Sequence, residues 1–252
     1  MSEQRPRIAV ITFPGSNDDG DARLALEHLG AEAAAVWHAT TELDSDIGGV
    51  VLPGGFSYGD YLRCGALARS APVMDAVRGF AADGGPVLGI CNGFQILCEA
   101  GLLPGVLRPN RQLEFVCADV TVIVESTGTP FTSGLARGDE LVIPVKHGEG
   151  NWVADDELYA DLVEGGQIVV RYAEDVNGSR SRVAGVANRD GNVVGLMPHP
   201  EHAVDPLLGP TGGVPLLEGL IGAARERLAG YASGLADAGS TRLHAHHLQC
   251  LP

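Results

Sequence analysis

The chain has 252 residues, 45% of them apolar, so it can build the core of one α/β domain with insertions or of two small domains. Its 32 acidic and 17 basic residues give a net charge of −15, which argues against nucleic acid or an anionic membrane as the main partner. The sequence contains no apolar run of about 18 residues, so no membrane-spanning helix is expected, and no signal peptide is expected either. The 5 cysteines include no C-x-x-C pair, which favours reduced thiols in a cytoplasmic protein.

The first half of the chain alternates strand-like apolar runs with helical segments. We predict strands at residues 7–13, 32–37 and 47–52, helices at 22–29 and 73–82, and a strand followed by a helix within 84–99. Strands that alternate with helices at this spacing form parallel sheets with right-handed crossovers. This half therefore predicts a three-layer α/β fold.

The second half is β-rich and is punctuated by turn residues. We expect strands at 114–124, 140–145, 168–172, 183–187 and 193–197, a hairpin loop at 188–192 and a final helix at 215–228. The predicted fold is thus a mostly parallel central sheet flanked by helices with an antiparallel extension, all in one domain over 1–228. Residues 229–252 are predicted to be a flexible tail, and its possible metal ligands match no structural zinc spacing: His244, His246, His247 and Cys250.

A cysteine separates the strand from the helix within 84–99. Cys91 has glycine at both second neighbours, Gly89 and Gly93, which is the pattern of a nucleophile elbow. Side chains at those two positions would crowd each other on so sharp a turn, and glycine removes the crowding. The start of a helix also favours a thiolate, because its free N–H groups and dipole stabilise negative charge. A buried structural cysteine is the alternative, but the elbow favours a nucleophile.

A histidine and a glutamate follow the last predicted strand, in the segment Met-Pro-His-Pro-Glu at 197–201. The residue before a proline is biased towards extended backbone, so His199 should be extended. Side chains two residues apart then project to the same side, which would place Glu201 beside the His199 ring. The pair predicts a proton carrier and the carboxylate that orients it, completing a triad with Cys91.

Two glycines follow the strand at 47–52. Gly54 and Gly55 would let the backbone approach a ligand closely, and a backbone N–H there could pair with that of Asn92 to form an oxyanion hole. An ordinary tight turn explains the two glycines equally well. No phosphate-binding loop of the G-x-x-x-x-G-K-[ST] type occurs, so no nucleotide site is predicted in this chain.

Several of these segments resemble a known family. Segments 89–95 and 197–201 resemble the triad, or class I, glutamine amidotransferases. Within that group, four further segments resemble the glutaminase subunits of phosphoribosylformylglycinamidine synthases: 53–63, 144–150, 177–179 and 206–209. The resemblance covers roughly residues 7–225 and includes every predicted site residue.

The resemblance implies hydrolysis of L-glutamine to glutamate and ammonia. The ammonia would pass to a large synthetase subunit, joined by a small accessory subunit, for ATP-dependent conversion of formylglycinamide ribonucleotide to formylglycinamidine ribonucleotide in purine synthesis. ATP and magnesium would bind the synthetase, with no cofactor or metal in this chain. The resemblance implies that Cys91 is the nucleophile, that His199 is the general base and acid, and that Glu201 orients His199. It also implies that the N–H groups of Gly55 and Asn92, beside Gly54, stabilise the oxyanion, and that Gln95 holds the substrate amide.

Three positions depart from the family pattern. Asp18 stands where cysteine is frequent, Lys146 where a small residue is commoner, and His202 where arginine is frequent. An amidotransferase serving another synthetase, a non-catalytic subunit that kept the fold, and a cysteine hydrolase on a similar scaffold are the alternatives. The intact triad argues against the second, and the complete segment at 197–201 argues against the third.

Overall fold

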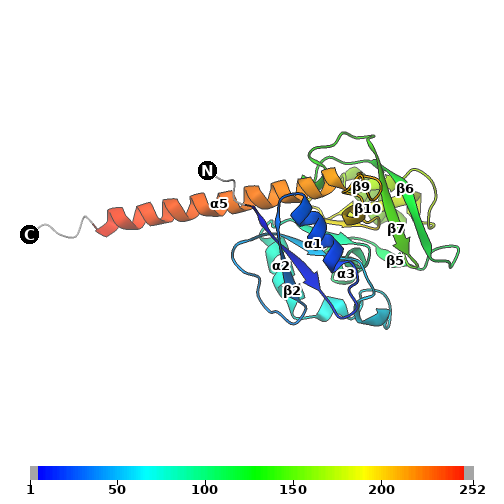
Figure 1. The fold of residues 1–252 in the computed structure, drawn as a ribbon, viewed down its shortest axis with the longest axis horizontal. Coiled ribbons are helices and arrows are strands. Elements are labelled where there is room, and N and C mark those ends of the chain that lie inside the picture. Colours follow the sequence, from blue (N-terminus) through cyan, green and yellow to red (C-terminus); the bar gives the residue numbers. More distant parts are fainter. Residues whose placement is uncertain (1–4, 247–252) are drawn as a thin grey trace, which may run out of the picture.

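A computed structural model describes residues 5–246 of the chain, and the side chains of residues 5–230 (Figure 1). Its main sheet contains nine strands: β1 (Arg7–Thr12), β2 (Glu32–Trp37), β3 (Ile47–Leu52), β4 (Val87–Ile90), β6 (Val116–Val124), β7 (Glu140–His147), β9 (Ile168–Tyr172), β10 (Val183–Ala187) and β11 (Val193–Leu196). Two short strands that the sequence did not predict, β5 (Val106–Arg108) and β8 (Asn151–Val153), form a separate antiparallel pair.

The strand order in the main sheet is β2-β1-β3-β4-β11-β10-β9-β6-β7. Neighbours from β2 to β11 are parallel, and neighbours from β11 to β7 are antiparallel. The predicted α/β fold, with a parallel sheet and an antiparallel extension, is therefore confirmed. One detail differs: β11 leaves the hairpin at 188–192 antiparallel to β10 but pairs in parallel with β4 on its other side. It thus belongs to both halves of the sheet.

Helices flank this sheet (Figure 1). They are α1 (Asp19–His28), α2 (Val73–Ala82), α3 (Asn92–Glu99), α4 (Asp156–Glu164) and α5 (Val214–His246). Helix α1 contacts β1 and β2, α5 contacts β1 and β3, and α3 contacts β3, β4 and β11. A Cβ atom on Gly48 would lie 2.6 Å from the carbonyl oxygen of Ala224, so glycine allows α5 to approach β3 closely.

Two helices differ from the sequence prediction. Helix α4 was not predicted; the Asp155 carboxylate caps it by accepting a 2.8 Å hydrogen bond from the Leu158 N–H, but only Leu162 is fully buried. Helix α5 continues to His246, well past residue 228, through a stretch rich in alanine, which favours helix. His247 and Cys250 lie outside the described residues, and the flexible tail stays a prediction.

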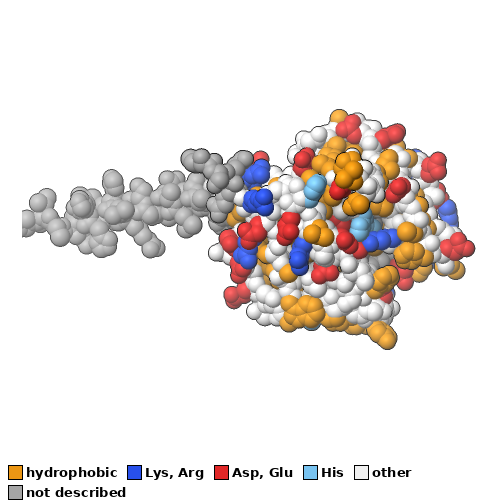
Figure 2. All heavy atoms as spheres, in the orientation of Figure 1, with side chains coloured by type: hydrophobic (Ala, Val, Ile, Leu, Met, Phe, Trp, Pro, Cys, Tyr) orange, Lys and Arg blue, Asp and Glu red, His pale blue; other side chains and the backbone are white. Residues whose placement is uncertain are grey.

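The central strands are apolar and almost completely buried. Every residue of β3, β4 and β11 is buried, as expected for parallel strands covered on both faces. Among residues 5–246, no helix is long and apolar enough to cross a membrane. On the face in Figure 2, acidic and basic side chains are interspersed with apolar ones and the acidic ones do not gather in one place.

The sheet brings two chain segments to one edge. Strands β4 and β11 are parallel neighbours, and their last residues, Ile90 and Leu196, are paired in register. Cys91 and the segment at 197–201 therefore leave the sheet side by side, although residues 91–192 separate the two strands in sequence. Strand β3 ends near the same edge and leads into Gly54 and Gly55.

Candidate active site

Cys91 occupies a strained turn between β4 and α3. Its φ of +50° lies in the left-handed region, which non-glycine residues seldom adopt. The turn is held by a 2.7 Å hydrogen bond from the Cys91 N–H to the Leu196 carbonyl, and by the Gln95 N–H, which donates to the Cys91 carbonyl at 3.1 Å. A Cβ atom on Gly89 would lie 2.7 Å from the Gly93 carbonyl oxygen, and one on Gly93 would run into the Leu52 carbonyl oxygen, so neither position has room for a side chain.

His199 and Glu201 lie next to each other at the short 3-10 helix η5 (Pro200–His202), which His199 precedes. Nδ1 of His199 is 2.7 Å from Oε1 of Glu201, and both residues are buried. Because a carboxylate oxygen can only accept, Nδ1 carries the hydrogen of this bond. Nε2 of His199 is buried and makes no hydrogen bond among the described residues. The ring therefore keeps one nitrogen available for chemistry.

The charges around His199 favour its protonated form. Burial alone would lower its pKa, but the negative charges of Glu201 and Cys91 outweigh burial and raise the pKa from 6.5 to about 10. In such a pair the thiolate can attack an amide carbon, and the protonated imidazole can then give its proton to the leaving nitrogen.

The loop after β3 packs so closely against the segment after β1 that only glycine fits at Gly55. Gly55 has a φ of +143°, and a Cβ atom there would lie 2.6 Å from the backbone nitrogen of Asn17. The Gly54 carbonyl accepts from the N–H groups of Asn17 and Asp18, both at 3.2 Å, and the Phe56 N–H donates to Gly15 at 2.8 Å. These bonds hold the loop against the segment that follows β1.

The side chains of Asn92 and Gln95 connect α3 to two neighbouring loops. Asn92 Oδ1 accepts from the Ser57 N–H at 3.1 Å, and its Nδ2 donates to Gln95 Oε1 at 2.9 Å. Gln95 Nε2 in turn donates to the Glu149 carbonyl at 2.7 Å. The Asn92 N–H itself stands at the first position of α3, where no carbonyl within the helix can accept from it.

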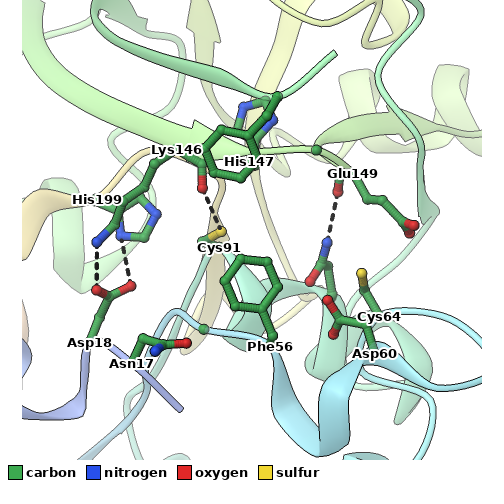
Figure 3. Close-up of a pocket in the computed structure, with 14 residues that line it drawn as sticks. Asn17, Asp18, Phe56, Asp60, Cys64, Cys91, Lys146, His147, Glu149 and His199 are labelled. Carbon is green, nitrogen blue, oxygen red and sulfur yellow. Dashed lines mark hydrogen bonds and ion pairs between the residues drawn. The ribbon is translucent and has the colours of Figure 1, made fainter. Parts of the chain in front are cut away.

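A pocket of about 270 Å³ opens over the thiol (Figure 3). Of the predicted residues, Cys91, Gly55, Gln95 and His199 line it, whereas Gly54, Asn92 and Glu201 support it from behind. The structure adds residues to which the sequence assigned no role: Asp18, Phe56, Asp60, Cys64, Phe115, Lys146, His147 and Glu149. Several belong to the segments 53–63 and 144–150, so the resemblance of those segments to the family could have indicated that they lie near the site.

Cys64 is a second cysteine in the pocket, but its surroundings disfavour a thiolate. Burial raises its pKa, and the carboxylates of Asp60 and Glu149 raise it further. Burial also raises the pKa of Asp60. The surroundings of Cys64 therefore disfavour the thiolate form that a nucleophilic cysteine needs.

Four possible metal ligands gather behind the triad histidine. One ligand atom each from Asp18, His199, Glu201 and His202 lies within 4.8 Å of the others. The Lys146 ammonium reaches into the same cluster, 2.5 Å from Asp18 Oδ1 and 2.9 Å from His202 Nε2. A positive charge is thus already present there, and the absence of a metal site stays a prediction of the sequence.

Comparisons with known proteins show the family of this chain. The family of CobB/CobQ-like glutamine amidotransferase domains matches residues 5–211. The phosphoribosylformylglycinamidine synthase subunit PurQ of Rubrobacter xylanophilus is 54% identical over 219 residues, covering 87% of this chain and 99% of the relative. PurQ of Rhodopseudomonas palustris is 52% identical over 225 residues, covering 85% of this chain and 97% of the relative.

A solved structure gives the same result. A chain in the structure of PurLQS from Thermotoga maritima superposes with a TM-score of 0.81 at 45% identity, covering 87% of this chain and 99% of that chain. The strained cysteine elbow, the buried histidine–glutamate pair and these likenesses lead to one conclusion. The chain belongs to the PurQ family of phosphoribosylformylglycinamidine synthase subunits, within the glutamine amidotransferases.

Proposed function

We propose that this chain hydrolyses L-glutamine through a triad of Cys91, His199 and Glu201 and delivers the ammonia to a synthetase. The observation that carries the proposal is the shared pocket: Cys91 and His199 both line it, and Glu201 bonds the ring nitrogen that faces away from it. No other cysteine lining the pocket is suited to act as a thiolate.

In the first half of the reaction, the Cys91 thiolate attacks the side-chain amide carbon of glutamine. The carbonyl π electrons move to oxygen, and the N–H groups of Gly55 and Asn92 stabilise the oxyanion. As the C–N bond breaks, His199 Nε2 gives its proton to the leaving nitrogen, so that ammonia departs and a glutamyl thioester remains. Glu201 keeps Nδ1 protonated and the ring oriented throughout.

In the second half, the now neutral His199 takes a proton from water. The resulting hydroxide attacks the thioester carbon, the C–S bond breaks, and glutamate leaves while the thiolate and the imidazolium are restored. One glutamine and one water thus give one glutamate and one ammonia, with no oxidant or metal in the balance.

The ammonia needs an acceptor outside this chain. The relatives are named as subunits of phosphoribosylformylglycinamidine synthase, and the solved neighbour is titled as the PurLQS assembly, which supports a large synthetase subunit and a small accessory subunit as partners here. ATP and magnesium would then bind the large subunit, which uses the ammonia to form formylglycinamidine ribonucleotide. Because purine synthesis consumes the product, we place the complex in the cytoplasm.

The test is a synthesis assay on the reconstituted complex with either glutamine or ammonia as nitrogen donor. Cys91→Ala should abolish synthesis from glutamine and leave synthesis from ammonia intact, because only the glutaminase half needs the thiol. Cys117→Ala is the matched control, since Cys117 is an exposed cysteine on β6. Glutamine-dependent synthesis by Cys91→Ala would reject the proposal.

A further inference from the structure

Three charged or polar side chains from three separate elements meet behind the His199 ring. Asp18 precedes α1, Lys146 lies on β7, and His202 ends η5. Lys146 Nζ is 2.5 Å from Asp18 Oδ1 and 2.9 Å from His202 Nε2, and His202 Nε2 is 3.4 Å from Asp18 Oδ1. From the sequence, all three positions are expected to depart from the family pattern. Their contact indicates that they form one unit.

The unit touches the catalytic histidine through Asp18. Oδ2 of Asp18 lies 3.6 Å from Nδ1 of His199 (Figure 3). Glu201 Oε1 approaches the same atom to 2.7 Å. Two carboxylates therefore face a single N–H. Both are almost fully shielded from water, with side chains 5% and 0% exposed, so neither is screened by solvent.

Only one of these carboxylates has a lysine as its partner. Burial would raise the pKa of Asp18, but its contacts with His202 and Lys146 outweigh burial and lower the pKa to about 2. Asp18 is therefore ionised at neutral pH, with its charge balanced by the Lys146 ammonium. Glu201 Oε2, in contrast, has no hydrogen-bond partner among the described residues, and Glu201 Oε1 lies closer to His199 Nδ1, at 2.7 Å, than to His202 Nε2, at 3.7 Å.

Lys146 is well suited to this position. It is the only lysine among the 252 residues, whose other basic side chains besides histidine are all arginines. An ammonium is a compact point charge, whereas the wider arginine fork needs a planar partner. The Lys146 backbone also faces the nucleophile, because its carbonyl oxygen lies 3.8 Å from Cys91 Sγ. Lys146 thus lies beside the Cys91 thiol through its backbone and contacts Asp18 through its side chain.

We propose that Lys146 is a positioning residue for the triad: its ammonium neutralises Asp18, so that Glu201 alone orients His199. This inference rests on the proposed glutaminase function. Without the ammonium, Asp18 would keep only its contact with His202 within the unit, and its carboxylate would compete with Glu201 for the Nδ1 hydrogen and turn the ring away from the thiol. It would also stabilise the imidazolium and make His199 a weaker acid.

The first experiment compares Lys146→Met, Asp18→Asn and the double variant in glutamine-dependent turnover by the reconstituted complex. Lys146→Met should lower kcat about 10-fold with little change in KM, since directly contacting residues couple at this scale. The alkaline limb of its kcat/KM profile should move to higher pH, because an unbalanced carboxylate holds the imidazolium proton more tightly. In the double variant both effects should largely disappear, since the competing charge is gone.

The pH profile must be interpreted against every titratable or charged group around the ring. Those that face His199 come from the elbow, from β7, from the segment before α1 and from η5: Cys91, Lys146, His147, Asp18, Glu201 and His202. Only Asp18 and Lys146 change in this series. A shift that appears in Lys146→Met and vanishes in the double variant therefore belongs to that pair.

A further variant separates charge from shape. Lys146→Arg keeps the positive charge and should retain more activity than Lys146→Met. Equal losses in the two variants would show that the charge of Lys146 does not matter.

A second experiment needs no substitution at Asp18 and uses chain that is already folded. Acetylation of the full chain with an amine-specific reagent can modify only the amino terminus and Lys146, and peptide mass spectrometry shows which has reacted. Acetylated chain mixed with the partner subunits should lose kcat as Lys146→Met does. The same treatment should not lower the activity of Lys146→Arg below its own untreated value, because that variant has no lysine to react.

The outcomes distinguish the inference from the function on which it rests. Glutamine-dependent activity in Cys91→Ala would overturn both. If Cys91→Ala is inactive but Lys146→Met raises only KM, Lys146 binds substrate and does not position the triad. If the double variant shows the product of the two single effects, Asp18 and Lys146 act independently. Either of the last two results overturns the inference alone.

Discussion

The carboxylate of Glu201 lies 2.7 Å from Nδ1 of His199, with the two side chains 0% and 1% exposed. Solvent cannot compete for a hydrogen bond buried to this degree, so the bond keeps its strength and the ring its orientation. The Nδ1 side of the ring is closed by carboxylates, and proton exchange with a substrate is left to Nε2. This arrangement separates the roles of the two residues.

We therefore predict different losses on substituting them. His199→Ala should be nearly as damaging as Cys91→Ala, because the leaving ammonia can no longer be protonated. Glu201→Gln keeps the shape but removes the charge, and should cost less, up to about 10⁴-fold in kcat. The measurement is glutamine-dependent turnover of the complex, with ammonia-supported synthesis as the control. A larger loss for Glu201→Gln than for His199→Ala would reverse the assigned roles.

Gly54 should tolerate no side chain. A Cβ atom there would lie 2.7 Å from Cε1 of His199 and would run into the Asp18 carboxylate. Gly54→Ala should displace the ring and lower kcat by about 10²-fold, the cost of a misplacement of about 1 Å. Gly79→Ala on α2 is the matched control: a Cβ atom there meets nothing within 4 Å, and the change should stabilise the fold by about 0.5–1 kcal/mol without loss of activity.

A glutamine-analogue electrophile should label Cys91 and not Cys64, although both line the pocket. The reason is that burial and two neighbouring carboxylates keep Cys64 in its unreactive thiol form. Peptide mapping after partial labelling measures the ratio. Cys64→Ala should be labelled as fast as the unmodified chain, whereas adduct on Cys64 in the unmodified chain would contradict the assignment.

The stability of the chain should fall as the pH is lowered from about 6.5 to about 4. Burial, with a smaller effect of the His199 charge, lowers the pKa of His147 from 6.5 to about 4. Between these values the unfolded state binds a proton that the folded state does not, so the free energy of unfolding rises with pH, by up to about 3 kcal/mol from this one group. Urea unfolding at several pH values measures the slope.

The control for this prediction is His147→Gln, which retains an amide able to donate to Asn110 Oδ1, the 3.1 Å partner of His147 Nδ1. The free energy of unfolding of this variant should depend less steeply on pH between about 4 and 6.5. His199 acts in the opposite direction, since its raised pKa adds stability that is lost only as the pH rises towards about 10. Equal slopes for the two proteins between pH 4 and 6.5 would exclude His147 as the cause.

Removal of residues 230–252 should leave folding and assembly unchanged. The described side chains that bury α5 in the core all precede Arg225: Leu216, Leu217, Leu220, Ile221 and Ala224. We expect a 1–229 chain to match the full chain in free energy of unfolding and in complex formation with the synthetase. Loss of complex formation on truncation would show that the tail takes part in the interface.

The full chain and the 1–229 chain also test whether glutamine hydrolysis depends on the synthetase. Each chain alone should hydrolyse glutamine poorly, and the synthetase with its substrate and ATP should raise the rate by shifting the site to its competent form. Full glutaminase activity of the isolated chain would contradict coupling.

Much of the site was predictable because its signals are local in sequence. The elbow depends on glycines two residues from Cys91, and the buried strand before it is a continuous apolar run. The contact between His199 and Glu201 was also predicted, but through extended backbone. In the structure Glu201 lies in the 3-10 helix η5, so the contact is correct and the backbone that makes it differs.

The rest depends on contacts between distant segments. Asp18 and Lys146 are 128 positions apart in the chain, and nothing in either segment indicates that they form an ion pair. The parallel pairing of β11 with β4 was missed for the same reason, since the hairpin with β10 is the only local signal in that region. Helix α4 was missed because its buried stripe is narrow, with Leu162 alone fully buried.

The order of the strands also decides when the chain gains its chemistry. Cys91 follows β4, but His199 follows β11, which enters the sheet between β4 and β10 only after residues 91–192 have been made. Contacts this distant in sequence close late in folding, because the loop between them must first be ordered. A chain still emerging from the ribosome therefore carries Cys91 without His199 beside it, and the two side chains meet only after β11 has joined the sheet.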